Sequence, residues 1–188
     1  DVLEAKIFFG EKLVASIGSE FIENNGEDRK RQEKMSAEEI KQDCETKAFT
    51  RLAGRIKKRF PRLPILLLAD SLYASKPVMD LCREYKWEFL IRYKKGSIPS
   101  IAEEYEKIPE KGKTEKAEFV NDIDYEGKPV HVLRYREEKA GETTEFQWLS
   151  SIRITKGNAE KMAETGRKRW KIENEGFNRQ KNWQGSIT

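Results

Sequence analysis

The sequence predicts a mixed α/β protein, with a sheet of parallel and antiparallel strands flanked by helices. Two short apolar runs, Ile65–Ala69 and Trp87–Tyr93, lack the alternation of half-exposed strands and are typical of strands buried on both faces. Between them, Lys76–Lys86 has the apolar spacing of a helix. Strand, helix and strand in this order form a βαβ unit with parallel strands. Near the start, Val2–Ile22 reads as an antiparallel hairpin.

The elements before this βαβ unit are a hairpin and a long basic helix. Val2–Phe9 and Leu13–Ile22 are apolar-rich strands joined by three residues, a connection short enough for a hairpin. Ser36 followed by Glu39 matches a capping box and begins a helix that ends near Phe60. One apolar stripe of this helix is expected to face the core, and consists of Phe49, Leu52, Ala53, Ile56 and Phe60.

The chain after the second buried strand divides into an acidic insertion and a basic end. We expect a short helix near Ile101–Tyr105 and hairpin strands at Ala117–Tyr125 and Val130–Tyr135. A last strand, Phe146–Ile154, precedes a helix that Asn158 can cap. We therefore predict three parts: the first part of the core (1–93), a β-rich insertion (94–145), and the last strand with a final helix (146–188).

The positive charge is concentrated in two segments that flank the acidic one. The net charge of the whole chain is only +4, but it is +6 over residues 29–60 and +4 over residues 156–188. Residues 101–150 carry a net charge of −5. Such segregation fits a surface that binds a polyanion, although two solvated helix faces would give the same pattern.

Several classes of protein are not supported by the composition. No apolar run is long enough to span a bilayer, and no leader with a basic start and an apolar stretch is found. Cys44 and Cys82 make neither a disulfide framework nor a zinc site, and are expected to be buried. The single histidine, His131, is expected to be exposed on a hairpin strand. The expected setting is cytoplasmic.

Asp70 is the first candidate for chemistry. It follows an apolar strand directly, and the carboxyl ends of strands are where α/β sheets place ligands and catalytic groups. The alternative is an ordinary capping or turn aspartate before the Lys76–Lys86 helix.

Glu173 is the second candidate. It lies four residues after Arg169, so the two share a helix face, as they also would in an ordinary ion pair. Two carboxylates from distant parts of the chain can together hold divalent cations such as Mg²⁺. A pair of such ions supports phosphodiester displacement, and the basic helices would hold a nucleic-acid backbone.

Two motifs give the chain a recognisable resemblance. Asp70-Ser71-Leu72-Tyr73-Ala74 follows a buried strand, and Arg169-Trp170-Lys171-Ile172-Glu173-Asn174-Glu175-Gly176-Phe177-Asn178 lies on the last predicted helix. Both resemble the DDE transposases of insertion sequences, and within them the fourth insertion-sequence family. Shorter stretches agree, namely Val2–Lys6, Ser16–Asn24 and Lys41–Glu45. The resemblance implies a ribonuclease-H-like mixed sheet with a β-rich insertion before the last strand and the catalytic helix.

By this resemblance, Asp70 matches the second catalytic aspartate and Glu173 the catalytic glutamate, both as metal ligands. Arg169 matches the signature arginine that contacts a DNA phosphate, and Glu175 lacks its spacing to the arginine. The signature lysine falls on Gln180 or Lys181. The remaining basic residues of the final helix expected to contact DNA are Arg167 and Lys171.

Two departures from the family pattern stand out. Gly166 occupies the place of the signature tyrosine, three residues before Arg169. The first catalytic aspartate is expected on a strand that the chain does not contain, since Asp1 follows no buried strand. The sequence is thus similar to a fragment that lacks the first catalytic strand.

The resemblance also implies a reaction and partners. A complete domain of this kind uses Mg²⁺ or Mn²⁺, two ions in all, to hydrolyse DNA at element ends and to join the freed 3′-hydroxyl to target DNA. The expected partners are element-end and target DNA and, in a synaptic complex, a second copy of the chain. The setting would be the nucleoid of a prokaryotic cell, with no membrane partner. The alternative is a DNA-binding remnant without catalysis.

Overall fold

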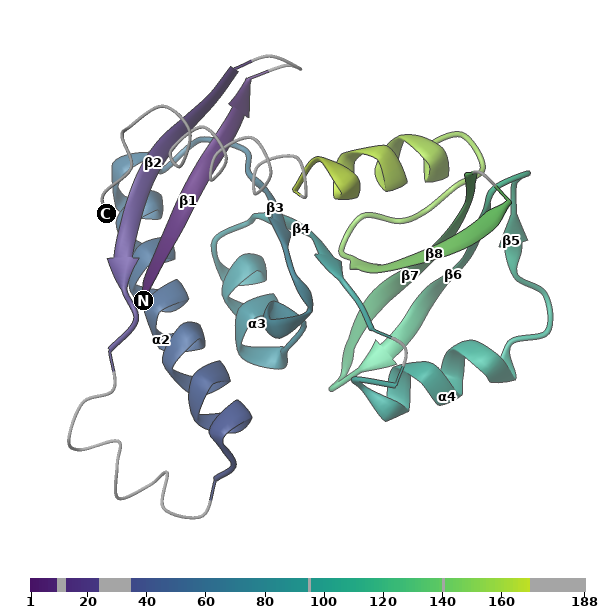
Figure 1. Cartoon of the computed structure of the whole chain (residues 1–188), viewed down its shortest axis with the longest axis horizontal. Coiled ribbons are helices and arrows are strands. Elements are labelled where there is room, and N and C mark those ends of the chain that lie inside the picture. The colour runs from purple at the N-terminus through teal and green to yellow at the C-terminus, as the bar shows by residue number, and fades with distance from the viewer. Residues whose placement is uncertain (10–12, 24–34, 95, 140, 170–188) are drawn as a thin grey trace. The chain divides into compact units, whose positions relative to one another are not determined.

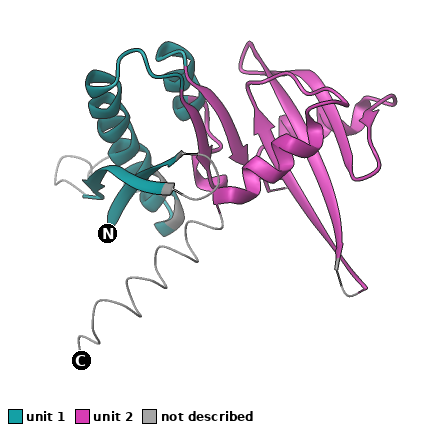
Figure 2. Cartoon of the chain, turned by 90° about the horizontal axis from the view of Figure 1, so that it is seen from above, with its two compact units in different colours: residues 1–64, 77–86 teal, residues 65–76, 87–188 magenta. Residues whose placement is uncertain are grey.

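The computed structural model describes residues 1–9, 13–23, 35–94, 96–139 and 141–169 (Figure 1). The chain forms two compact units, coloured separately in Figure 2. The first comprises Asp1–Pro64 and Pro77–Lys86, and the second comprises Ile65–Lys76 and the chain from Trp87 onward. The predicted division into 1–93, 94–145 and 146–188 stays a prediction. Within the described residues, no helix combines the length and the apolar character needed to cross a membrane.

The first unit begins with the predicted hairpin. Strands β1 (Val2–Phe9) and β2 (Leu13–Phe21) pair antiparallel, and the register shifts between Ala5 and Lys6. Gly18 pairs with Ala5 at this irregularity, and a Cβ atom on Gly18 would lie 3.0 Å from Leu52 Cδ1. The glycine therefore allows the hairpin to approach the following helix closely.

That helix, α2 (Ala37–Arg59), begins and ends as predicted. Its capping box is formed: Ser36 N donates to Glu39 Oε2 at 2.7 Å, and Glu39 N donates to Ser36 Oγ at 3.3 Å. Arg55 of α2 lies 2.8 Å from Glu20 Oε2 of β2 and ties the helix to the hairpin. The apolar stripe is buried at Phe49, Leu52, Ala53 and Ile56, while Phe60 is half-buried.

Helix α3 (Lys76–Glu84) is two residues shorter than predicted. The main chain of Lys86 has a φ of 57°, which is incompatible with continuing the helix. Lys57 Nζ of α2 donates a hydrogen bond of 2.9 Å to the main-chain oxygen of Tyr85. Both cysteines, Cys44 and Cys82, are buried, as predicted.

The second unit is built on a six-stranded mixed sheet with the order β3-β4-β8-β7-β6-β5. β3 pairs parallel with β4, as the βαβ prediction required, and the other neighbours pair antiparallel. The strands are β3 (Leu66–Ala69), β4 (Glu88–Arg92), β5 (Gly112–Lys113), β6 (Ala117–Tyr125), β7 (Lys128–Lys139) and β8 (Glu142–Ser150). Two short helices accompany them, η1 (Ser71–Tyr73) and α4 (Pro99–Lys107).

The prediction that β3 is buried on both faces is wrong. Leu66 is 38% exposed, and the following residues of the strand are only half-buried. The reason is position, because β3 is an edge strand of the described sheet whereas β4 lies between two neighbours. The apolar run of β3 predicts a strand, but it does not predict the position of that strand in the sheet.

The strands of the predicted insertion are found with different bounds. β6 matches the prediction residue for residue, and Glu126 and Gly127 turn the chain with positive φ values of 54° and 77°. β7 runs beyond the predicted Val130–Tyr135 because it pairs with β8 as far as Lys139. The prediction that the last strand spans Phe146–Ile154 is wrong at both ends, since β8 begins at Glu142 and ends at Ser150.

Helices cover both faces of this sheet. The register aligns Phe119, Leu133 and Trp148 in one row, and a helix of residues 159–169 packs on that face. The next row, on the opposite face, includes Glu118 and Arg134, which contact Tyr105 of α4. The buried core on the first face consists of Leu90, Ala117, Phe119, Leu133, Trp148, Ile154, Ala159, Met162 and Ala163.

The prediction that His131 is exposed is wrong, since only 6% of the residue is accessible. β7 is not the outer strand of an isolated hairpin, because β8 pairs along its other side and Ser150 lies opposite His131. His131 Nδ1 accepts a hydrogen bond of 3.1 Å from the main-chain N–H of Asp122, which has a φ of 60° at the irregularity in β6. Burial lowers the pKa of His131, against a smaller raising effect of the Asp122 carboxylate.

The lowered pKa of His131 predicts an acid-sensitive stability. The unfolded chain takes up a proton on this side chain near pH 6.5, whereas the folded chain keeps it neutral to lower pH. The contribution of His131 to the free energy of unfolding is therefore complete above about pH 6.5. It is lost as the pH falls toward the pKa that His131 has in the folded chain. We expect the urea-unfolding free energy to drop more between pH 7 and pH 5 for the wild type than for His131→Gln. Equal drops in the two proteins would contradict this account.

Candidate nucleic-acid and metal site at the end of β3

Asp70 lies immediately after β3 and is half-buried. Its Oδ1 accepts a hydrogen bond of 2.9 Å from the main-chain N–H of Leu72, so that Asp70 caps η1. The capping role considered from the sequence is therefore present, although the helix is η1 rather than α3. An ionised carboxylate has about four lone-pair sites, so one capping bond leaves acceptor capacity for a cation.

The pairing of β3 with β4 places a second polar residue beside Asp70. Ala69 is the register partner of Ile91, and the strands are parallel. Asp70 and Arg92 therefore lie side by side at the carboxyl ends of β3 and β4, hereafter called this edge of the sheet. Side chains of partners in register point to the same face, because alternation is shared by both strands. This is the face that the 159–169 helix covers, since Leu68 and Leu90, two residues earlier, contact its core cluster.

The 159–169 helix runs toward this edge. Asn158, just before the helix, and Met162 within it line a space with Ile152, beyond the end of β8. Later, a Cβ atom on Gly166 would lie 2.5 Å from Trp148 Nε1, and Trp148 is the partner of Arg92 in the register. The contacts therefore move along β8 toward the carboxyl end of β4 as the helix proceeds.

Arg167 continues this series of contacts. Its guanidinium lies 5.2 Å from the centre of the Phe146 ring and 2.8 Å from Glu137 Oε1 of β7. These contacts fix the end of the described helix over β7 and β8.

Gly166 is required by packing. Trp148 is almost fully buried, and its indole occupies the space that any side chain at position 166 would need. A tyrosine, which the resemblance leads one to expect at this position, would clash with the Trp148 indole. The close approach of helix and sheet depends on this pair.

Arg92 was not singled out from the sequence. Its guanidinium lies 4.9 Å from the centre of the Phe146 ring and 5.3 Å from that of Trp148. It donates to the main-chain oxygens of Gln147 at 3.2 Å and Glu145 at 3.4 Å. A charged residue near the end of a predicted buried strand, beside the strand that Asp70 follows, is the signal that could have found it.

Arg92 also has a shifted pKa. Burial lowers the pKa of its guanidinium, the positive charge of Arg169 lowers it further, and Glu145 acts in the opposite direction. The electrostatic interaction indicates that Arg169 and Arg92 lie near each other.

The structure describes only some of the predicted site residues. Asp70, Arg167 and Arg169 are described, and all three belong to the second unit. The predicted residues outside the described ranges are Lys171, Glu173 and Lys181, together with Glu175 and Gln180.

Among the described residues, no group of three or more His, Cys, Asp or Glu side chains is gathered to hold a metal ion. Asp70 offers one carboxylate of the kind that Mg²⁺ prefers, at an accessible sheet edge. The donor chemistry of Asp70 therefore fits a divalent ion as one ligand, and the others must come from elsewhere.

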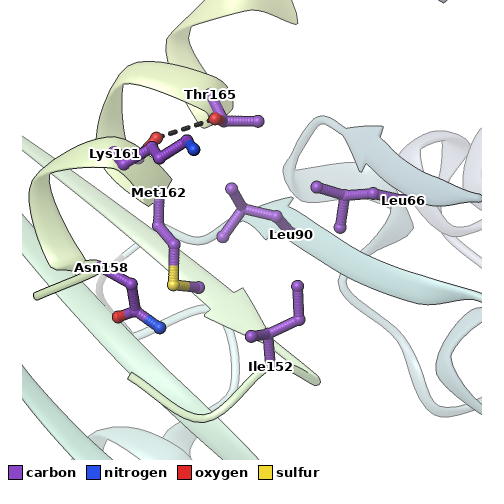
Figure 3. Close-up of a pocket in the computed structure, with 7 residues that line it drawn as sticks. All are labelled: Leu66, Leu90, Ile152, Asn158, Lys161, Met162 and Thr165. Carbon is purple, nitrogen blue, oxygen red and sulfur yellow. Dashed lines mark hydrogen bonds between the residues drawn. The ribbon is translucent and has the colours of Figure 1, made fainter. Parts of the chain in front are cut away.

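A cavity of about 140 Å³ lies under the 159–169 helix (Figure 3). Met162 points between Leu90 and Ile152, and Leu66 of β3 lies across the space. Its lining contains no carboxylate, and the one hydrogen bond drawn, from Thr165 Oγ1 to the Lys161 main-chain oxygen at 2.7 Å, is internal to the helix. The cavity is therefore a packing space and not the metal site.

Comparison with known proteins identifies the family of the chain. Residues 41–185, more than half of the chain, match the family described as transposase DDE domain. No curated protein matches the chain.

The contact between Gly166 and Trp148 predicts that the substitution Gly166→Ala lowers the stability of the protein. In an ordinary helix, replacing glycine by alanine stabilises by about 1 kcal/mol. For Gly166→Ala we expect a loss of about 1–3 kcal/mol instead, because the new methyl group must displace a buried indole. Gly157→Ala is the control, since the nearest atom to its Cβ would be Thr155 Oγ1 at 3.9 Å. Urea unfolding measures both, and a stabilised Gly166→Ala would contradict the packing.

Proposed function

Because the chain belongs to the transposase DDE domain family, we propose that it hydrolyses DNA at the ends of a mobile element and joins the freed 3′-hydroxyl to target DNA. One observation carries the assignment of the site. Asp70 and the end of the 159–169 helix, far apart in the sequence, come to the same edge of one sheet in the second unit. Element-end and target DNA are the substrates, and a second copy of the chain is the partner in the complex that joins them.

Asp70 and Glu173 are the proposed catalytic residues and ligands of Mg²⁺ or Mn²⁺, with two ions in the complete site. Enzymes of this family generally use divalent ions, and carboxylate oxygens are their usual ligands. When bound, such ions activate the attacking hydroxyl and neutralise charge on the leaving oxygen. Asp70 meets the requirement for a fixed ligand, because the hydrogen bond from Leu72 N holds its carboxylate in place.

The basic residues of the final helix hold the DNA in this proposal. Arg169 contacts a phosphate near the carboxylates, and Arg167, Lys171 and Lys181 contact the backbone further along. The Arg167 guanidinium is also held by Glu137 and Phe146, so its contribution includes fixing the helix. Arginine suits this role because its planar donors match phosphate oxygens in pairs.

The third carboxylate of the proposed site comes from outside the described residues. β3 is an edge strand of the described sheet, with main-chain groups available for pairing. We propose that a strand pairing there brings the first catalytic aspartate next to Asp70.

A second function is DNA binding without catalysis. The positive charge concentrated in residues 29–60 and 156–188 fits DNA binding whether or not the chain cleaves the DNA. Under this alternative the chain binds DNA in a salt-dependent manner but does not cleave it.

Asp70→Asn is the most direct test of the proposal. Asparagine retains the capping acceptor for Leu72 N but removes the negative charge, so folding is preserved while metal binding is lost. We expect Mg²⁺-dependent nicking of supercoiled DNA to fall by about 100-fold or more. Glu110→Gln is the matched control, because Glu110 is exposed on the acidic segment, and it should nick like the wild type.

The outcomes separate the two functions. Nicking that survives unchanged in Asp70→Asn or in Glu173→Gln would refute the catalytic assignment. A wild-type chain that binds DNA but shows no nicking with Mg²⁺ or Mn²⁺, even when a strand that carries an aspartate is added, would establish the binding function instead.

A further inference from the structure

The guanidinium of Arg92 is fixed in place by neutral groups. Two of its N–H groups donate to main-chain oxygens of β8, and two aromatic rings lie within 5.3 Å of its central carbon. Among the ion pairs of the described residues, none includes Arg92. The side chain is thus oriented before any ligand binds, and its charge is not cancelled by a direct carboxylate contact.

The surroundings of Arg92 are rich in positive charge. Arg167 lies against the same Phe146 ring, and Arg169 is close enough to repel Arg92 electrostatically. Two carboxylates of β7 and β8 are already engaged: Glu137 pairs with Arg167, and Glu145 contacts Arg134 at 3.3 Å. The Glu145 carboxylate also contacts Gln147 at 2.7 Å and Arg136 at 3.2 Å.

The position of Arg92 relates this charge to the proposed reaction. Arg92 and Asp70 leave neighbouring parallel strands one residue after the Ala69–Ile91 pair. Neighbouring strands lie about 4.8 Å apart, so the origins of the two side chains are close, on the same face and edge. A DNA strand that presents a phosphate to a metal ion on Asp70 passes beside Arg92.

We infer that Arg92 binds a phosphodiester group of the DNA strand next to Asp70 and orients that strand for cleavage. This inference rests on the proposed function and adds a residue to its site. A guanidinium stacked on rings offers paired donors in a fixed plane, which fits two oxygens of one phosphate better than a flexible ammonium does. Arg169 approaches the same anion from the helix, so that both charges are neutralised together.

A purely structural role for Arg92 makes a different prediction. If Arg92 only joined β4 to β8, its loss would lower the stability of the sheet and leave the number of phosphate contacts unchanged. The slope of log affinity against log salt counts those contacts, at about 0.9 for each phosphate neutralised on duplex DNA. The slope is therefore a readout that a structural role does not move.

The test measures binding of the full chain to a labelled DNA duplex over a range of salt concentrations. Arg92→Gln should weaken binding about tenfold and reduce the slope by about 1. Arg153→Gln is the matched control, because Arg153 is an exposed arginine of the same unit that pairs with Asp122. It should leave both the affinity and the slope unchanged.

Arg92→Lys keeps the inference testable if Arg92→Gln fails to fold. Lysine retains the charge but not the paired donors, so we expect a wild-type slope with affinity reduced about threefold or more. Arg92→Lys that binds as tightly as the wild type, or folded Arg92→Gln with an unchanged slope, overturns the inference while the proposed function stands. A wild-type chain without salt-dependent DNA binding overturns both.

Discussion

The parallel pairing of β3 with β4 is the constraint on which the candidate site depends. Its register, with Ala69 opposite Ile91, brings Asp70 and Arg92 to one edge although 21 residues separate them in the chain. A shift of the register by one residue would turn one of the two side chains to the other face of the sheet. A carboxylate that holds a cation and a guanidinium that holds a phosphate are useful together only if they face the same substrate, so the pairing sets the chemistry that this edge can perform.

The second requirement is that the final helix arrives at that edge, and packing decides this. Gly166 lets the helix rest directly on Trp148, and Arg167 then reaches Phe146 and Glu137. A larger residue at position 166 would lift the helix from the sheet and move every residue that follows. The family signature places a tyrosine where this chain has Gly166, so the chain combines a large residue in the sheet with a small one in the helix.

The sequence predicts the local structure of this chain well. It predicts poorly which distant residues and strands lie next to one another. The capping box at Ser36, the β6 strand and the strand end at Asp70 depend on residues close together in the chain, and all three are found as predicted. The edge position of β3 and the burial of His131 depend on which strand pairs with which, and a local pattern does not contain that information. Arg92 was missed for the same reason, because its importance comes from β8 and the final helix, both more than 50 residues away.

The electrostatics of this edge favour an anionic ligand over an empty site. The guanidinium groups of Arg92 and Arg167 both lie against Phe146, and burial already makes the charged form of Arg92 less favourable, which is why its pKa is lowered. Repulsion by Arg169 lowers the pKa of Arg92 further, although the charge of Glu145 acts in the opposite direction. A bound phosphate removes the repulsion and adds charge-assisted hydrogen bonds, which are roughly twice as strong as neutral ones. Because a ligand that binds only the folded state also stabilises it, the positive charge that weakens the free protein is recovered as affinity for DNA.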